Sequence, residues 1–233
     1  MKRQKEYAVI VAAGTGTRMN SNTPKQFLKL GTRPVLMHTL LAFFNYSADL
    51  ELVLVLPEPQ MKKWSTRCRA LRFKSPVKIV KGGITRFQSV KNGLLAIGDQ
   101  GLVAIHDGVR PLVEKEIIAA SFQIASLHGS AVASVRLKES LRETDNDMTR
   151  AVDRSRFRVI QTPQTFQIPL IRKAYETKEE PGFTDDAMVA ENAGFRISLF
   201  EGSYMNIKIT TPEDLLVAKA LLQVRSGTKS GMK

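Results

Sequence analysis

The stretch YAVIVAAGTGTRMNSNTPKQFLKLG, residues 7–31, decides how the rest of the sequence is interpreted. Its first seven residues are apolar and rich in β-branched side chains, which predicts a buried strand, and Gly14 and Gly16 then open a loop. Arg18 and Lys25 follow the glycines. In an open α/β sheet such a loop exposes backbone N–H groups at the carboxyl end of a strand, where ligands bind, and the cations attract an anion. The expected ligand is a polyphosphate.

Two better-known phosphate-binding loops do not fit this stretch. A dinucleotide-binding loop needs a third glycine where this sequence has Met19, and a P-loop ends in Gly-Lys-Ser/Thr, whereas Gly16 is followed by Thr17 and Arg18. The alternative is that Gly14 and Gly16 only make a tight turn. The two cations favour the ligand-binding interpretation.

The rest of the chain alternates between strands and helices. Strands are predicted at 51–57, 77–80, 102–111, 131–135, 196–200 and 206–209, and helices at 35–44, 58–74, 87–96, 114–128, 168–177, 185–193 and 212–225. This alternation predicts an α/β fold with a doubly wound, mostly parallel, Rossmann-like sheet. The polar residues 136–160 break the alternation and predict a projecting β-hairpin arm. We expect one domain over residues 1–226 and a disordered basic tail at 227–233.

Composition narrows the function. With 233 residues, 43% hydrophobic, the chain is long enough to bury a core, and no stretch approaches the roughly 18 apolar residues of a membrane span. The start MKRQKE followed by an apolar run imitates a signal peptide, but the run has only seven residues and reads as the first strand, so a cytoplasmic enzyme is expected. The single cysteine, Cys68, predicts an inert thiol, and the spacing of His38, His106 and His128 predicts no zinc site.

The net charge of +13 is the unusual bulk property. It raises the possibility of nucleic-acid binding, but the basic residues are scattered and are not interleaved with aromatic residues. Solvated faces and attraction for anionic substrates account for most of the charge. We therefore expect no nucleic-acid partner.

Asp107 is the candidate metal ligand. It stands where a predicted strand meets its loop, with Arg110 three residues on. A carboxylate at that place can hold Mg²⁺ against a triphosphate, although a loop-capping role is the commoner use of such an aspartate. The neighbouring glycine loop favours the metal role.

Seven motifs in one order, the first of them made of two stretches, resemble a known family. AAGTGTRM at 12–19 and PKQFL at 24–28 look like the signature of the sugar-phosphate nucleotidyltransferases, and most closely of the 2-C-methyl-D-erythritol 4-phosphate cytidylyltransferase family. The further matches are GGITRFQSV (82–90), HDGVRP (106–111), AVDR (151–154), QTPQ (161–164), FTDDA (183–187) and NIKIT (206–210). Gly108 and Val109 replace two alanines of the family, and Ile84 replaces an acidic residue found in some members.

The resemblance implies an activity and a set of site residues. It implies transfer of CMP from CTP to a polyol phosphate, 2-C-methyl-D-erythritol 4-phosphate, with release of pyrophosphate and with Mg²⁺ as the divalent cation. The implied residues are Arg18, Lys25 and Lys208 for catalysis, Ala12, Ala13, Gly14, Gly16, Gly83 and Ser89 for CTP, Arg110, Arg154, Thr162 and Thr184 for the polyol phosphate, and Asp107 for the metal. It also implies a homodimer formed through the arm, and we expect the arm to deliver Arg154 to the neighbour's site.

Two other functions stay open at this point. Ribitol-5-phosphate cytidylyltransferases share the loop, the lysine and the metal site, but they more often have Ala-Gly-Gly where this chain has Ala12-Ala13-Gly14. A basic α/β module that binds RNA without catalysis is the alternative from another class. Such a module would be retained on heparin without competition from CTP, and it would release no pyrophosphate.

Overall fold

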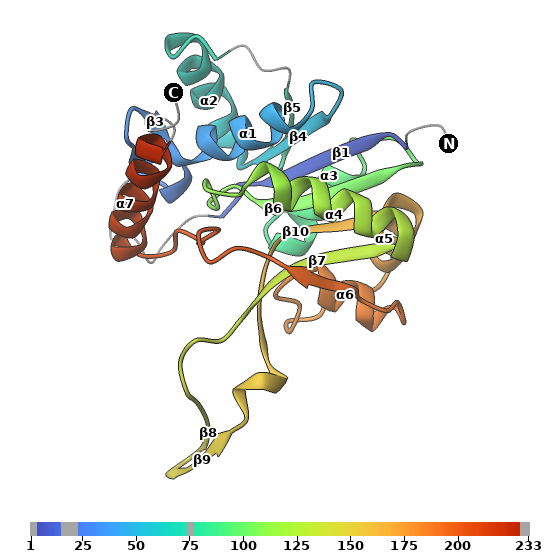
Figure 1. Ribbon diagram of the computed structural model, residues 1–233. Helices are drawn as coiled ribbons and strands as arrows, with labels where there is room; N and C mark the ends of the chain where they lie inside the picture. The colour runs from blue at the N-terminus through green and yellow to red at the C-terminus, as the bar shows by residue number, and fades with distance from the viewer. Residues whose placement is uncertain (1–3, 15–22, 74–76, 229–233) are drawn as a thin grey trace.

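A seven-stranded sheet forms the centre of the computed structural model, which describes residues 4–14, 23–73 and 77–228 (Figure 1). Strand β1, Glu6–Val11, lies in the middle of the order β11-β7-β10-β6-β1-β4-β5 and is parallel to both of its neighbours. The other strands of this sheet are β4 (Glu51–Leu56), β5 (Val77–Lys81), β6 (Leu102–Asp107), β7 (Ser130–Arg136), β10 (Arg158–Gln167) and β11 (Leu199–Glu201). All pairs except those of β10 are parallel, so the predicted mostly parallel α/β sheet is confirmed.

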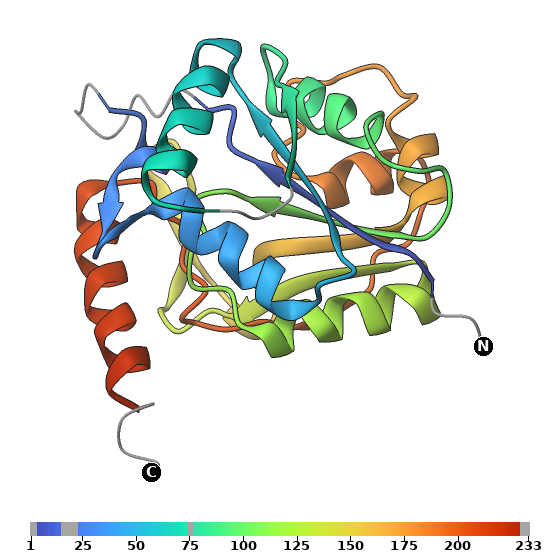
Figure 2. The same ribbon diagram turned by 90° about the horizontal axis from the view of Figure 1, so that it is seen from above.

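Helices cover both faces of the sheet (Figure 2). Alternate side chains of β1 point to opposite faces. Ala8 and Ile10 pack in one core with α1, α2 and α4, while Tyr7 and Val9 pack in a second core with α3, α5 and α6. The helices are α1 (Val35–Tyr46), α2 (Glu58–Ala70), α3 (Arg86–Leu94), α4 (Lys115–His128), α5 (Ile168–Ala174) and α6 (Asp186–Asn192). These two cores fix β1 from both sides, so the loop that follows it starts from a rigid strand.

A third, smaller core holds one corner of the molecule together. Helix α7, Pro212–Thr228, packs against a short hairpin of β2 (Lys29–Leu30) and β3 (Arg33–Pro34), which the sequence did not predict. The core consists of Leu30, Val35, Val109, Leu112, Ile209 and Ala218. The hairpin follows the 3₁₀ turn η2, Lys25–Phe27, and α7 follows the segment that carries Lys208. The same corner therefore supports two of the candidate site residues.

Strand β10 is the main departure from the predicted fold. It lies between β6 and β7, antiparallel to both, where no strand was predicted. Its polar residues Gln161, Thr162, Gln164 and Thr165 are buried, and a register shift between Ile160 and Gln164 accommodates the proline among them. Polar composition and an internal proline both argue against a central strand in a sequence, which is why this one was missed.

The prediction of a strand at 206–209 was wrong. These residues form an irregular segment, although the side chains of Asn206 and Ile209 are fully buried. Ile209 is buried by packing with residues of α7 and of the loop after β6, and its N–H donates to the carbonyl of Val109 rather than to a strand of the sheet. The remaining predicted elements agree in type, with shifted ends: the strand predicted at 102–111, for example, stops at Asp107.

The predicted hairpin arm is confirmed. Strands β8 (Leu141–Asp145) and β9 (Met148–Val152) pair antiparallel through a turn in which Asn146 has a φ of 50°. Asparagine tolerates this left-handed conformation better than most residues. The hairpin projects away from the sheet and its helices (Figure 1).

A disordered tail was expected at 227–233. Helix α7 continues to Thr228 and so includes the first two residues of that range, while residues 229–233 lie outside the described residues. Within the described ranges, no helix is both long enough and apolar enough to cross a membrane.

Candidate active site

The ends of β1 and β6 bring the first candidate residues together. The two strands are parallel, and Val11 is in register with Asp107, so the loop after β1 starts beside that carboxylate. A pocket opens at this edge of the sheet. We call it the glycine-loop pocket, and its wall consists of Val11, Ala12, Ala13, Gly14, Lys25, Gln26, Gly83, Ile84, Thr85, Arg86, Ser89, Asp107, Val109 and Lys208. Gly16 and Arg18, the other candidates on this loop, lie outside the described residues.

A buried glutamine shapes the loop after β1. The side-chain amide of Gln26 donates hydrogen bonds to the carbonyl oxygens of Ala12, at 2.9 Å, and of Gly14, at 3.2 Å. Gln26 is 1% exposed, so these bonds are shielded from water. They orient the loop from the same turn that carries Lys25. Sequence analysis did not predict this role, because the two segments touch only in the folded chain.

Ser89 belongs to the opposite wall of this pocket. Its hydroxyl donates to the carbonyl of Thr85 at 2.8 Å and accepts from the backbone N–H of Gly83 at 3.1 Å. Thr85 caps the start of α3 by accepting from the N–H of Gln88. The hydroxyl of Ser89 therefore holds the Gly83 turn against the first turn of the helix.

Gly108 allows the two loops to approach closely. A Cβ atom at this position would lie 2.8 Å from the Cβ of Ala12 and 3.2 Å from the carbonyl oxygen of Val11. Its backbone N–H donates to the same carbonyl at 2.8 Å. The replacement of alanine by glycine in HDGVRP thus suits the spacing of these loops.

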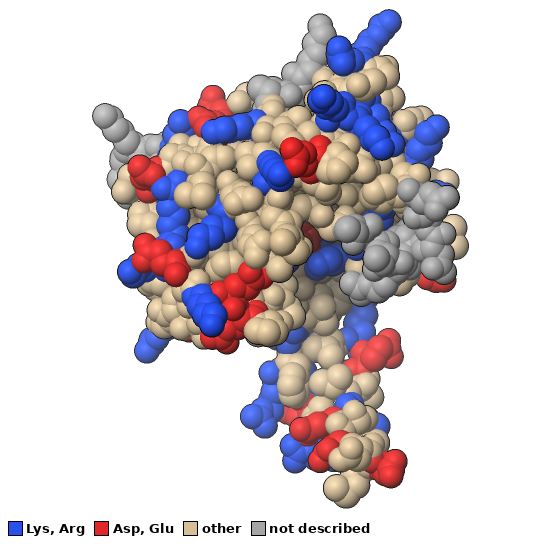
Figure 3. Space-filling model, turned by 180° about the vertical axis from the view of Figure 1, so that it is seen from behind, with Lys and Arg blue, Asp and Glu red and all other residues tan. Residues whose placement is uncertain are grey.

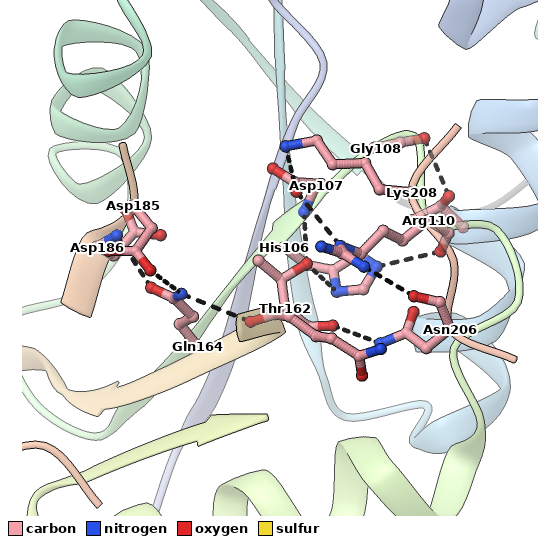
Figure 4. Close-up of polar contacts among 12 residues, drawn as sticks. His106, Asp107, Gly108, Arg110, Thr162, Gln164, Asp185, Asp186, Asn206 and Lys208 are labelled. Atoms are coloured by element: carbon pink, nitrogen blue, oxygen red, sulfur yellow. Dashed lines mark hydrogen bonds and ion pairs between the residues drawn. The ribbon is translucent and has the colours of Figure 1, made fainter. Parts of the chain in front are cut away.

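Asp107 is the electrostatic centre of the site (Figure 4). Its Oδ2 lies 3.0 Å from Lys208 Nζ and 3.4 Å from Arg110 Nε, and its Oδ1 lies 3.9 Å from Arg86 Nε. Burial alone would raise the pKa of this carboxyl, but the charges of Lys208, Arg86 and Arg110 outweigh it and hold the pKa well below its ordinary value. Asp107 is therefore ionised at neutral pH, and it gathers three cations around one carboxylate.

A buried hydrogen-bond network lies behind Asp107. His106 Nε2 contacts the carbonyl oxygen of Arg110 at 3.2 Å, and its Nδ1 contacts Thr162 Oγ1 at 3.1 Å. Burial lowers the pKa of His106 to about 4, so the ring carries a single N–H at neutral pH. Because a carbonyl only accepts, that N–H is on Nε2, and the Thr162 hydroxyl donates to Nδ1.

The direction of these bonds limits what Thr162 can offer a ligand. Its hydroxyl also accepts from the backbone N–H of Asp107 at 3.1 Å. The proton and one lone pair are thus committed to the protein, and the remaining lone pair can accept from a ligand hydroxyl. Asn206 holds the same residue from the other side, because its Nδ2 donates to the backbone carbonyl of Thr162 at 2.7 Å. The backbone carbonyl of Asn206 in turn accepts from Arg110 at 2.7 Å.

A second pocket adjoins the first along strand β10. We call it the β10 pocket, and its wall consists of Arg86, Asp107, Arg110, Ile160, Gln161, Thr162, Gln164, Thr184, Asp185 and Lys208. It shares Arg86, Asp107 and Lys208 with the glycine-loop pocket. Three of the four residues expected to bind the polyol phosphate, Arg110, Thr162 and Thr184, line this pocket. Two ligands in the two pockets would meet at the shared residues.

Arg154, the fourth of those residues, lies elsewhere. It opens the 3₁₀ turn η3, Arg154–Arg156, between the hairpin and β10, and its guanidinium donates to the carbonyl of Lys138. It does not line either pocket of its own chain. The other candidates that the structure describes all line at least one of the two pockets, and this arginine lies on the arm.

The sequence missed two charged residues of the site. Arg86 lines both pockets. Both terminal nitrogens of its guanidinium donate hydrogen bonds to Asp186, which is fully buried. Both belong to motifs that carried the family resemblance, GGITRFQSV and FTDDA, so their place in those motifs was the available signal.

Asp107 is also the only residue of the pockets' shared floor that suits a metal ion. Among the described residues, its Oδ1 forms an ion pair with Arg86 Nε at 3.9 Å, whereas Oδ2 lies within 3.4 Å of two cations, Lys208 and Arg110. Among the described residues, no group of three or more His, Cys, Asp or Glu side chains converges on a possible metal. A single carboxylate fits Mg²⁺ when substrate phosphates supply further ligands, and it does not fit an all-protein metal cage.

Basic residues are spread over the surface. On the face shown in Figure 3, Lys and Arg side chains lie over the body and along the arm, with Asp and Glu between them. The arm itself carries the pair Arg150–Glu143.

The chain is similar to proteins of one family over nearly its whole length. A family model described as 2-C-methyl-D-erythritol 4-phosphate cytidylyltransferase matches residues 7–224. A protein of that name from Porphyromonas gingivalis is 48% identical over 221 residues, which cover 94% of this chain and 99% of the relative. The enzyme of the same name from Bacteroides thetaiotaomicron is 45% identical over 218 residues, covering 94% of this chain and all of the relative.

Solved structures agree with the sequence matches. The 4-diphosphocytidyl-2C-methyl-D-erythritol synthase of Anaerococcus prevotii superimposes with a TM-score of 0.81 at 30% identity, covering 94% of this chain and 96% of that one. The 2-C-methyl-D-erythritol 4-phosphate cytidylyltransferase of Thermus thermophilus gives a TM-score of 0.73 at 31% identity, covering 94% and 99%. The likeness therefore extends over nearly the whole fold in each case.

Proposed function

The chain belongs to the 2-C-methyl-D-erythritol 4-phosphate cytidylyltransferase family, and we infer from this membership that it transfers CMP from CTP to 2-C-methyl-D-erythritol 4-phosphate. The products are CDP-methylerythritol and pyrophosphate, and the reaction belongs to the non-mevalonate route to isoprenoids. The chain is a nucleotidyltransferase. Ribitol-5-phosphate transfer and RNA binding are not favoured, because the family model and these relatives carry the other activity in their names.

The observation that carries this function is the shared floor of the two pockets. We place CTP in the glycine-loop pocket and the polyol phosphate in the β10 pocket, so that the reacting groups meet beside Asp107, Lys208 and Arg86. An oxygen of the polyol phosphate attacks the α-phosphorus of CTP in line. The new bond forms as the bond to the β-phosphate oxygen breaks, and pyrophosphate leaves.

No general base is needed, because the attacking phosphate oxygen is already an anion. The work of the protein is to bring two anions together and to stabilise the charge of the transition state. This explains a site built from cations. We assign Arg18, Lys25 and Lys208 to the phosphates of CTP and to the transition state.

The acceptor is held by the residues of the β10 pocket. Arg110 and Lys208 supply positive charge to its phosphate, and both are already oriented by Asp107. Thr184 lies at the rim, and Thr162 offers an acceptor to a polyol hydroxyl. This division of roles follows from the donor and acceptor capacity of each side chain.

We propose that Mg²⁺ assists the reaction. Asp107 would hold the ion together with phosphate oxygens of CTP, and the bound ion supplies positive charge to the triphosphate. The Lys208 ammonium and the Arg110 guanidinium would then be released from part of their attraction to Asp107 and be able to face the substrate phosphates.

We also propose that the active form is a homodimer in which the arm delivers Arg154 to the neighbour's site. The motivation is the position of Arg154 on a projecting hairpin, outside both pockets of its own chain. Apolar side chains at the base of the arm are exposed, among them Phe157 at 45% and Val159 at 47%. A second copy would cover them. A cytoplasmic location remains our proposal as well, since both substrates are soluble metabolites.

Pyrophosphate release tests the function directly. The chain is assayed with CTP and Mg²⁺ against a panel of polyol phosphates that includes methylerythritol 4-phosphate, erythritol 4-phosphate and ribitol 5-phosphate. We expect the highest kcat/KM for methylerythritol 4-phosphate. A preference for ribitol 5-phosphate, or the absence of release with every acceptor, would contradict the assignment.

A further inference from the structure

Arg86 is the one charged side chain of the shared floor to which the proposed mechanism gives no role. It is the first residue of α3, and its side chain is 24% exposed. Its NH1 and NH2 donate to the two carboxylate oxygens of Asp186 at 2.9 and 2.6 Å. Such a two-pronged pair fixes the plane of the guanidinium as well as its position.

Asp186 is itself held from several directions. Its Oδ1 accepts from the hydroxyl of Tyr175 at 2.6 Å, and its backbone N–H donates to the side-chain oxygen of Gln164 at 2.9 Å. Asp186 opens α6, and the two residues before it, Thr184 and Asp185, line the β10 pocket. Arg86 therefore ties the start of α3, on the nucleotide side, to the start of α6, on the acceptor side.

The same guanidinium also faces Asp107. Its Nε lies 3.9 Å from Asp107 Oδ1, which is an ion pair beyond hydrogen-bonding distance. One planar cation thus spans two carboxylates, one at the end of β6 and one at the start of α6.

We propose that Arg86 is a positioning residue for the transfer reaction: it sets the distance between Asp107 and the Thr184–Asp185 wall of the β10 pocket. The acceptor phosphate is thereby held at the right place relative to the α-phosphorus. This inference rests on the proposed function. A misplacement of about 1 Å in such a geometry costs on the order of 10²-fold in rate, which makes a fixed wall worth a buried ion pair.

Replacement of Arg86 by lysine is the first test. Lysine keeps a positive charge opposite the buried Asp186, but its single nitrogen cannot make the fork and reach toward Asp107 as well. In Arg86→Lys we expect kcat/KM for the polyol phosphate to fall roughly 10–100-fold, while KM for CTP changes less than about threefold. An equal rise in KM for CTP and for the polyol phosphate, or an unchanged kcat/KM for the polyol phosphate, would overturn the proposal.

Arg172→Lys is the matched control. Arg172 is also a part-buried arginine that pairs with a carboxylate, Asp99, and donates to the carbonyls of Leu94 and Ile97, but it lines neither pocket. We expect this variant to lose thermal stability without a change in kinetics. If Arg86→Lys does not fold, Asp186→Asn breaks the same fork while it keeps the arginine and the size of its partner, and the same kinetic split is expected.

A double-mutant cycle separates positioning from a merely structural role. Thr184→Val is measured in the wild-type chain and in the Arg86→Lys chain. If Arg86 acts through this wall, the loss caused by Thr184→Val is much smaller in the Arg86→Lys background. Additive losses in an active enzyme would refute the positioning role. A wild-type chain that releases no pyrophosphate would instead refute the proposed function, so the two failures are distinguishable.

Discussion

The two pockets that meet at Asp107 are built in different ways. The glycine-loop pocket takes much of its wall from two short runs of sequence, residues 12–14 and 83–86, each following a strand. The β10 pocket takes its wall from short pieces of the loop after β6, of β10, of the start of α6 and of the segment before α7. These pieces are joined by a buried network in which Thr162, Asn206 and Arg110 hold one another.

This difference in construction indicates how each pocket recognises its ligand. A triphosphate is recognised by loop backbone and a few cations, which a local motif can supply. A branched polyol phosphate needs donors and acceptors placed individually, which only the assembled fold supplies. Substitutions in the first pocket should therefore act mainly on chemistry at the α-phosphate, and substitutions in the second on acceptor binding and on the network beneath it.

Lys25→Ala should have the largest effect. The loss of one donor that bears on transition-state charge typically costs ~10²–10³ in rate, so kcat should fall by about that factor while CTP binding weakens less. Single-turnover rates and equilibrium CTP binding measure the two effects separately. Lys29→Ala is the control, since Lys29 is exposed four residues away and lines neither pocket. Near-normal turnover in Lys25→Ala would remove the lysine from the mechanism.

Asp107→Asn should come next, because it damages the floor that both pockets share. The amide loses the charge that holds a hard cation, so we expect kcat/KM to fall by about 10²-fold and the Mg²⁺ concentration for half-maximal rate to rise. A Mg²⁺ titration of the initial rate is the measurement. If Asp107 only caps its loop, stability would fall and the Mg²⁺ dependence would stay unchanged.

Mixed dimers test whether the β10 pocket needs Arg154 from a second chain. Lys25→Ala and Arg154→Ala chains are unfolded, mixed and refolded, and random pairing makes about half of the dimers mixed. If Arg154 acts on the neighbour's site, each mixed dimer has one intact site, and about a quarter of wild-type activity should return. If Arg154 acts on its own chain's site, every site keeps one lesion. No recovery in verified mixed dimers would exclude the shared site and leave the cytidylyltransferase assignment standing.

Thr162→Val should have the smallest effect on the chemical step and a measurable effect on stability. Valine leaves the buried N–H of Asp107 and the Nδ1 of His106 without their partner. We expect a loss of about 1–3 kcal/mol in the free energy of unfolding, measured by urea denaturation. Thr162→Ser keeps the hydroxyl and should recover most of it. Equal stability of the two variants would contradict the stabilising role given to the hydrogen bonds of the Thr162 hydroxyl.

Much of the fold could be predicted because its main strands are apolar runs that are easily recognised in the sequence. The apolar run of β1 and the run that ends at Asp107 predict buried parallel strands, and the arm is marked by its polarity. Strand β10 could not be predicted, because its buried residues are polar and their partners are distant: Thr162 bonds His106, 56 residues away. Residues 206–209, Asn-Ile-Lys-Ile, misled in the other direction, since Asn206 and Ile209 are buried without pairing in a sheet.

The candidate site divides along the same line. Ala12, Gly83 and Asp107 follow strands and are visible as motifs, and the structure places them in one pocket. Gln26 and Arg86 were missed because their roles depend on partners 14 and 100 residues away in the chain. No local pattern specifies such a pair. A side chain whose function is to hold another segment becomes visible only when the segments are folded together.

The placement of the two substrates is tested most directly by a crystal structure with methylerythritol 4-phosphate and α,β-methylene CTP. In this CTP analogue a methylene group replaces the oxygen between the α- and β-phosphorus atoms, so the bond cannot be broken. We expect the triphosphate in the glycine-loop pocket, with its α-phosphorus between Lys25 and Lys208, and the polyol phosphate in the β10 pocket beside Arg110. A nucleotide bound in the β10 pocket, or the two ligands bound apart from the floor formed by Arg86, Asp107 and Lys208, would contradict it.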